Sequence, residues 1–149
     1  MLRMDRWQKV RGAQHGEFIM RTWLLLGLFV ALPVWADWSF VAKTDQFNLY
    51  GETNTRHKTG NVMRMWFMAD YKATQSVRLP PPLLWTDYQS IRELKEFDCV
   101  SRQHRSLKTM LFANHLTKGD PLYGYESAGT FGPVAAAALD EAQFQFACK

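Results

Sequence analysis

Cysteine is scarce in this chain, which has only Cys99 and Cys148 and no CxxC pair. Two cysteines so far apart, with no neighbouring pair of histidines, do not match the ligand spacing of a zinc site or of a thioredoxin-type redox centre. A GxSxG elbow, an HExxH pair, a Walker glycine loop and a GxGxxG turn are also missing. We therefore predict a protein that is not an enzyme and that holds no metal and no cofactor.

An apolar run long enough to span a membrane is absent as well. The longest uncharged apolar segment, Thr22 to Ala36, has 15 residues, whereas a transmembrane helix needs roughly 20. A basic residue precedes this segment, and small residues stand at the two positions that a signal peptidase reads, Val34 and Ala36. We interpret residues 1–36 as a leader with a secretory signal, with Met20 as the preferred start, and we expect no permanent membrane anchor.

The mature chain also lacks an excess of charge of either sign. The full chain has 18 Lys and Arg against 14 Asp and Glu; residues 1–36 hold five and two of these, which leaves 13 against 12 in residues 37–149. A net charge near +1 gives no global electrostatic reason to bind nucleic acid, and we predict no such partner. Residues 37–149 number 113, a length that suits a single domain with one core.

Both cysteines lie in this mature part. Export delivers the chain to an oxidising compartment, so we predict a disulfide between Cys99 and Cys148. Closing a loop of this length stabilises a fold by roughly 4 kcal/mol on the chain-entropy model.

Alternation of apolar and polar residues predicts strands along most of the mature chain. The predicted strands are residues 38–43, 47–50, 62–71, 90–99 and 101–116. The strand at 62–71 is the clearest, because every second residue is apolar, and we place it centrally. The polar stretch before it predicts a turn at Thr59-Gly60-Asn61. Residues 90–99 fit a helix as well, and we choose a strand. We predict that residues 72–89 are mostly connection, with Pro80-Pro81-Pro82 as a stiff linker in preference to a docking segment.

The period changes after a loop that is rich in glycine and aromatic residues. Pro133 opens an alanine-rich stretch in which apolar residues recur at helical spacing as far as Cys148. The sequence therefore predicts an α+β domain: an antiparallel sheet of about five or six strands, with one C-terminal helix packed on it and attached by the disulfide to the strand end at Cys99.

The histidines and clustered carboxylates offer little chemistry. His104 and His115 are eleven residues apart on one predicted strand, hence on opposite faces and roughly 35 Å apart, so they cannot share a metal. Glu93, Glu96 and Asp98 alternate with basic residues. We interpret these carboxylates as a solvated strand face with cross-strand ion pairs.

One local charge feature remains, the basic run of Arg102, His104, Arg105 and Lys108. We take these four as candidate binding residues. The sequence leaves open whether they face a glycosaminoglycan, an acidic host protein or solvent.

Several elements together resemble the surface-adhesin protein E family of small Gram-negative envelope proteins, over most of residues 38–148. These elements are the aromatic-led strand Trp38-Ser39-Phe40, the central strand at 62–66, the element Glu96-Phe97-Asp98-Cys99 with the basic segment after it, and the proline-led helix that ends in cysteine. The resemblance implies a compact antiparallel sheet with a packed C-terminal helix and one disulfide. It also implies binding of host matrix proteins such as laminin and vitronectin, and dimer formation.

The characterised adhesin resembles a lipoprotein, whereas this signal ends in Val34-Trp35-Ala36-Asp37 with no cysteine to lipidate. We therefore expect an exported, adhesin-like binding protein that is periplasmic or secreted, and we leave cell-surface exposure open. The alternative is a periplasmic structural or stress-related protein that inhibits an envelope enzyme or self-associates through an exposed strand face with Val62, Trp66 and Met68. A hydrolase with an unrecognised site is the third hypothesis.

Overall fold

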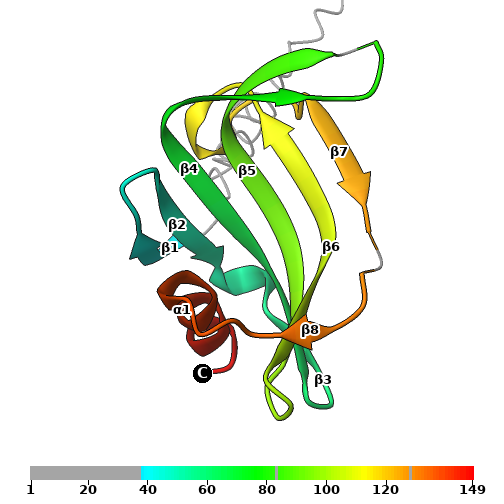
Figure 1. Ribbon diagram of the computed structural model, residues 1–149. Helices are drawn as coiled ribbons and strands as arrows, with labels where there is room; N and C mark the ends of the chain where they lie inside the picture. Colours follow the sequence, from blue (N-terminus) through cyan, green and yellow to red (C-terminus); the bar gives the residue numbers. More distant parts are fainter. Residues whose placement is uncertain (1–37, 83, 128) are drawn as a thin grey trace, which may run out of the picture. The chain divides into compact units, whose positions relative to one another are not determined.

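The computed structural model describes residues 38–82, 84–127 and 129–149, which form one curved antiparallel sheet and one α-helix (Figure 1). The predicted leader, its signal sequence, the start at Met20 and the cleavage after Ala36 lie outside the described residues. Within the described ranges, no helix has the length and apolar character needed to cross a bilayer.

The sheet of the described residues has eight strands, more than the five or six that the sequence predicts. They are β1 (Trp38–Lys43), β2 (Phe47–Glu52), β3 (His57–Thr59), β4 (Val62–Arg78), β5 (Trp85–Asp98), β6 (Gln103–Phe112), β7 (Tyr123–Glu126) and β8 (Gly132–Pro133). The order is β1-β2-β4-β5-β6-β7, while β3 pairs with β4 and β8 with β6. Every pair is antiparallel, which confirms the predicted kind of sheet.

The prediction of a connection over residues 72–89 is wrong. After a register shift, β4 and β5 pair again from Gln75 with Tyr88 to Arg78 with Trp85. Backbone hydrogen bonds hold such a ladder without apolar side chains, so the polar composition of this hairpin did not reveal it. The three prolines, 80–82, lie in the exposed tip that joins the two strands.

The turn predicted at Thr59-Gly60-Asn61 is confirmed. β3 and β4 form a hairpin that pairs Thr59 with Val62 through a two-residue connection. Gly60 has φ +61°, a left-handed conformation that glycine adopts without steric cost, and this explains the glycine at the turn.

Alternation along β4 divides the sheet into two faces. Met63, Met65 and Phe67 point to the face that carries the helix, which we call the helix face. The intervening residues point to the other side, which we call the opposite face. The buried core lies on the helix face and consists of Leu49, Met63, Met65, Phe67, Phe97, Phe144 and Ala147.

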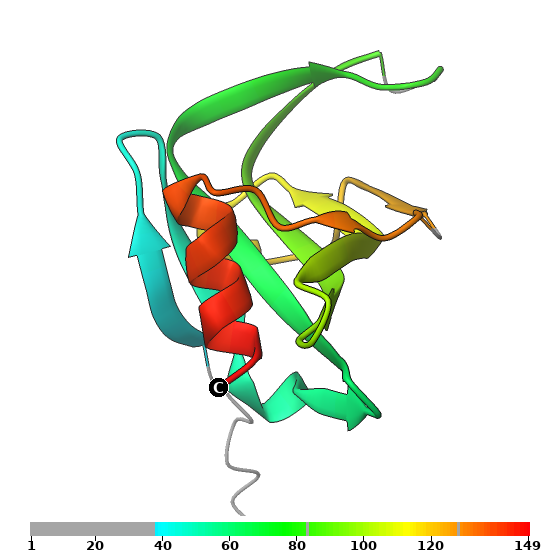
Figure 2. The same ribbon diagram turned by 60° about the horizontal axis from the view of Figure 1, so that its bottom comes forward.

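The C-terminal helix α1 (Ala138–Ala147) lies beside β1 and across the sheet (Figure 2). It begins five residues after Pro133 because Gly132 and Pro133 pair with β6 as a short strand, and the backbone is still extended at Ala137. The helix approaches β2 closely at one glycine: a Cβ atom on Gly51 would lie 2.3 Å from Cε1 of Phe146.

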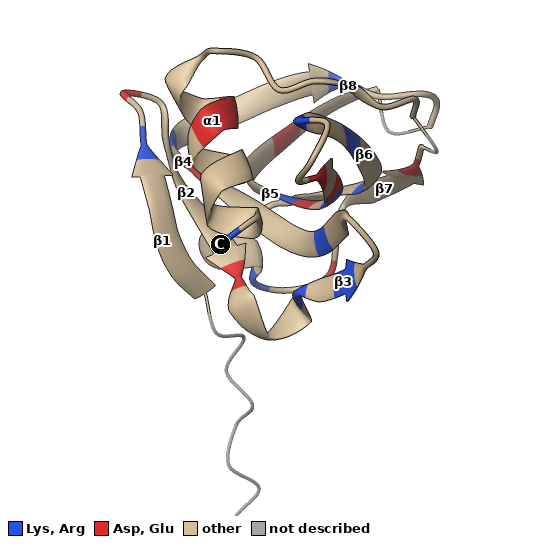
Figure 3. Ribbon diagram, turned by 90° about the horizontal axis from the view of Figure 1, so that it is seen from below, with Lys and Arg blue, Asp and Glu red and all other residues tan. Residues whose placement is uncertain are grey.

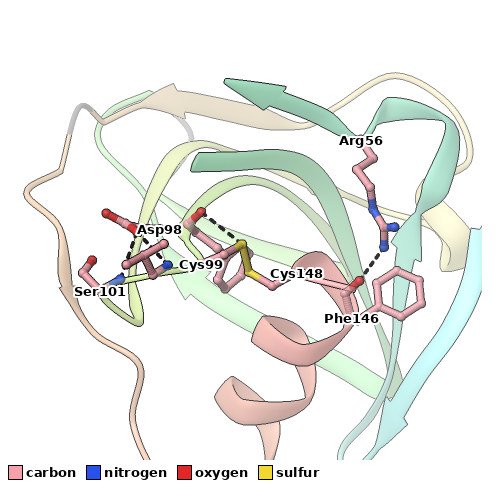
Figure 4. Close-up of a disulfide and its surroundings, with 8 residues drawn as sticks. Arg56, Asp98, Cys99, Ser101, Phe146 and Cys148 are labelled. Atoms are coloured by element: carbon pink, nitrogen blue, oxygen red, sulfur yellow. Dashed lines mark hydrogen bonds between the residues drawn. A yellow bond between two sulfur atoms is a disulfide. The ribbon is translucent and has the colours of Figure 1, made fainter. Parts of the chain in front are cut away.

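The predicted disulfide is confirmed, because Cys99 and Cys148 are bonded with their Cα atoms 5.6 Å apart (Figure 4). It fastens the end of α1 to the turn between β5 and β6. Asp98 shapes that turn, since its Oδ1 accepts hydrogen bonds from the backbone N–H groups of Val100 and Ser101, both at 3.0 Å. The hydrogen bond from the Ser101 backbone is the main cause that lowers the pKa of the Asp98 carboxyl, and the one from Val100 adds to it.

Candidate protein-binding surface

The structure does not gather the four candidate basic residues into one patch. Arg102 lies in the turn before β6, where its guanidinium stands 4.5 Å from the ring centre of Phe144 and pairs with Glu141 of α1 at 2.5 Å. His104 lies on the helix face and stacks on Phe97 with ring centres 5.9 Å apart. Arg102 therefore links the turn to α1, whereas His104 packs on β5.

Arg105 and Lys108 lie on the opposite face, although they are three residues apart. β6 pairs Arg105 with Glu96 and Lys108 with Leu94, and a register shift between these pairs leaves Leu107 as an extra residue. Such a bulge reverses the alternation, so both cations reach the same face. Figure 3 shows basic and acidic residues interspersed over β5 and β6 rather than separated by sign.

Two tryptophans and an arginine lie together on the opposite face. The Arg92 guanidinium stands 4.5 Å from the ring centre of Trp66 and 5.6 Å from that of Trp38. Its Nη2 pairs at 2.6 Å with Oε2 of Glu52, a residue that is only 5% exposed. The buried carboxylate therefore fixes the cation between two aromatic rings.

A second arginine site lies one row along the sheet. Glu96 of β5 faces Arg64 of β4 and Arg105 of β6 across the two ladders. Arg64 contacts Oε1 through Nε at 2.9 Å and Nη2 at 2.6 Å, and Arg105 contacts Oε2 through Nε and Nη2, both at 2.7 Å. The Glu96 side chain is 6% exposed, against 50% for Arg64 and 31% for Arg105.

The pKa of Glu96 reflects these neighbours. Burial raises the pKa of this carboxyl, but the hydrogen bonds and positive charges of Arg64 and Arg105 outweigh it and hold the pKa below its ordinary value. Glu96 is therefore a buried anion that two cations share. Cross-strand ion pairs are found as predicted, but the prediction that this carboxylate is solvated is wrong, because two guanidinium groups cover it.

A shallow pocket of about 210 Å³ opens beside this triad. Its walls combine the two arginines with apolar and polar groups from β3, β4 and the segment before β8. The lining residues are His57, Thr59, Val62, Arg64, Glu96, Arg105 and Phe131. Phe131 covers Arg105, with its ring centre 4.4 Å from the guanidinium carbon.

Aromatic and flexible apolar side chains continue the surface toward β1. Phe40 and Tyr50 form an edge-to-face pair at 5.9 Å, and the Phe40 residue is 57% exposed. Met110 of β6 is half-buried opposite Arg92. Arginine, tryptophan, tyrosine, phenylalanine and methionine are the residues enriched in protein–protein interfaces, so this face has the composition of a binding surface.

The hypothesis of an exposed patch with Val62, Trp66 and Met68 needs correction. All three point to the opposite face, but Met68 is 0% exposed and the other two are partly buried. Neighbouring side chains of the sheet cover Met68, so it offers no surface to a second copy.

The helix face holds a smaller polar cluster under the middle of α1. Lys95 is buried, and its Nζ donates to Oε1 of Gln143 at 2.9 Å and lies 3.7 Å from Oε2 of Glu93. Burial, and then the charge of Lys95, lower the pKa of His104. A recess of about 180 Å³ adjoins this cluster, and Tyr71 forms part of its wall. Burial is the main cause that raises the pKa of Tyr71 to about 12, and the neighbouring Tyr88 adds to it.

The prediction that His104 and His115 share one strand is wrong. β6 ends at Phe112, and His115 belongs to a short 3-10 turn. Its Nδ1 lies 3.1 Å from Oδ1 of Asp70. The structure contains no group of three or more His, Cys, Asp or Glu placed to hold a metal among the residues it describes.

Most residues of the opposite face carry no recognisable signal in the sequence. The alternation in β4 carried a signal for Arg64 and Trp66, which stand between the apolar residues Met63, Met65 and Phe67. Glu52 and Arg92 carried no such signal, because they meet only through the register of β2, β4 and β5.

Comparison with known proteins identifies the family of the chain. A search of curated proteins finds no match. Among solved structures, the chain is similar to protein E of Haemophilus influenzae, with a TM-score of 0.50 and 10% identity over 72% of this chain and 87% of that chain. At this identity the likeness concerns the fold alone. The model of the surface-adhesin protein E family matches residues 38–149, and the chain therefore belongs to the surface-adhesin protein E family.

Proposed function

We propose that this protein is an exported, non-enzymatic binding protein whose opposite face contacts an extracellular-matrix protein, such as laminin or vitronectin. The observation that carries the proposal is the pairing of arginines with aromatic rings over buried carboxylates. The side chains of Glu52 and Glu96 are buried, while the arginine side chains that pair with them keep part of their surface exposed to solvent. Family membership supports the same conclusion.

Fixed arginines make an efficient contact surface. A long side chain that becomes ordered only on binding loses roughly 0.5–1.5 kcal/mol of conformational freedom. Arg92 is already held by Glu52 and by two tryptophan rings, so it loses little further conformational freedom when a partner binds. We therefore expect Arg92 and its aromatic neighbours to dominate the binding energy, as Trp and Arg do in measured interfaces.

Binding of the purified full chain to immobilised laminin and vitronectin tests the proposal. We expect saturable binding, and a rise in Kd of at least tenfold for Arg92→Gln and for Phe40→Ala. Phe40 is the cleaner site, because it is exposed and holds no buried partner charge. Circular dichroism and thermal unfolding establish that each variant is folded.

Arg102→Gln is the control, because Arg102 is also an arginine in an ion pair with a glutamate, but its partner Glu141 lies on the helix. It should leave Kd unchanged. The proposal fails if the wild-type protein binds these matrix proteins no better than an unrelated protein of the same net charge, or if the control and the opposite-face variants behave alike.

Export is the premise for a host partner. We expect mass spectrometry of the mature protein to find an N-terminus at Asp37, and proteolysis of whole cells to degrade it. Protection in intact cells would place the protein in the periplasm and direct the search to envelope partners. The dimer implied by the family resemblance stays a prediction, which sedimentation equilibrium at micromolar concentration tests.

A further inference from the structure

We propose that the pocket beside Glu96 receives one carboxylate of the partner protein, either an Asp or Glu side chain or a chain terminus. Arg64 and Arg105 would hold this group. The inference rests on the proposed function, because it assigns a chemistry to one part of the same face, and it is testable without any partner.

The charge of the pocket favours a single anion. Arg64 and Arg105 bring two positive charges to the one negative charge of Glu96. The described residues that line the pocket include no second carboxylate. The site therefore keeps a net charge of +1, partly screened from water, and one further carboxylate would balance it.

The hydrogen bonds lead to the same conclusion. Each guanidinium has five N–H donors, and the contacts with Glu96 use only Nε and Nη2 of each. The two oxygens of Glu96 accept two contacts each, so their lone pairs are filled. Both Nη1 groups remain without a partner among the residues that the structure describes, and they belong to side chains that line the pocket.

The shape of the donors suits a planar acid. A guanidinium offers parallel N–H groups whose spacing matches the two oxygens of a carboxylate, and its rigid fork loses little freedom on binding. Phe131 and Val62 supply apolar walls for the methylene groups that carry the acid, while Thr59 and His57 add polar atoms at the rim. A sulfate or phosphate ester also accepts bidentate hydrogen bonds from a guanidinium, so the experiment below compares carboxylate and sulfate directly.

The experiment follows the arginine Nε–H signals of the ¹⁵N-labelled full chain by NMR during titration with sodium benzoate at constant ionic strength. Benzoate joins a carboxylate to an apolar ring that can contact Phe131. We expect saturable shifts of the Arg64 and Arg105 signals and none for Arg102. In Arg64→Gln, the benzoate affinity should fall at least tenfold.

Sodium sulfate and heparin are the comparison ligands, and Lys108→Gln is the matched variant, because it removes a cation from the same face outside the pocket. The assignment stands if benzoate binds more tightly than sulfate and Lys108→Gln leaves its affinity unchanged. It is overturned if all arginine signals shift linearly and alike, if sulfate or heparin competes more strongly than benzoate, or if both variants weaken binding equally.

The benzoate titration and the matrix-protein assay fail independently. Benzoate binding at Arg64 and Arg105 without any matrix-protein binding would retain the carboxylate site and reject the proposed function. Matrix-protein binding that survives Arg64→Gln, with no benzoate response, would retain the proposed function and reject this site.

Discussion

The contact between α1 and β2 at Gly51 gives the sharpest test of the packing. A Cβ atom at this position would lie 2.3 Å from Cε1 and 2.8 Å from Cδ1 of Phe146. The ring has little room to move, because it packs edge-on against Phe67 at 6.3 Å and lies 5.7 Å from the Arg56 guanidinium. Arg56 also donates to the carbonyl of Phe146 at 2.5 Å, which holds the backbone there.

Two effects of Gly51→Ala oppose each other. Replacing a strand glycine lowers the entropy of the unfolded chain and stabilises by roughly 0.5–1 kcal/mol. Overpacking a filled contact costs about 1–3 kcal/mol. Since the clash lies well below contact distance, we expect the second effect to win, with a net loss of about 1–2 kcal/mol in the free energy of unfolding. Urea denaturation measures this, and the melting temperature should fall by about 4 °C for each kcal/mol.

Gly132→Ala is the matched control, because no atom lies within 4 Å of a Cβ there and its φ is ordinary. It should be neutral or slightly stabilising. The double variant of Gly51→Ala with Phe146→Ala removes the clash, so its loss should fall short of the sum of the single losses by at least about 1 kcal/mol. Additive losses, or a neutral Gly51→Ala, would refute the reasoning.

Three further predictions concern the disulfide and the charged clusters. Replacing Cys99 and Cys148 by serine should lower the free energy of unfolding by about 4 kcal/mol, and a loss below about 1 kcal/mol in urea denaturation would contradict the loop-closure estimate. Because the pKa of Glu96 is lowered, its stabilising contribution is present above the ordinary carboxyl pKa of 4.5 and is lost as the pH falls through the folded value. Between pH 6 and 3, the free energy of unfolding should therefore fall more steeply for the wild type than for Glu96→Gln. Equal slopes of this free energy against pH would count against the buried triad. Lys95→Gln should raise the pKa of His104 by removing a nearby positive charge, and an unchanged NMR titration of the His104 ring would rule that contribution out.

The sequence predicted features that depend on local pattern. Alternation in residues 62–71 located the central strand, glycine located the turn at Gly60, and two cysteines in a chain with a predicted export signal located the disulfide. The predicted helix begins too early in the chain, at Pro133. The pairing of Gly132 with β6 keeps the backbone extended past that residue. Tertiary pairing there overrides a local preference for helix.

The opposite face could not be predicted, because its chemistry arises from register. Arg64, Glu96 and Arg105 stand on three strands and meet only when both ladders are aligned. The bulge at Leu107 adds a second difficulty. Without the bulge, simple alternation along β6 would place Arg105 and Lys108 on different faces. The four basic residues are close in sequence but have two structural roles.

The bond between Cys99 and Cys148 also makes the last third of the chain a closed covalent loop that holds β6, β7, β8 and α1. Lys118 lies exposed within this loop, in the connection before β7. If a protease hydrolyses the chain after Lys118, both products remain one molecule, and α1 stays fastened beside the turn on which it packs. Such a nicked protein would migrate as a single band until a reductant is added, so cleavage and release of the helix are separate chemical events.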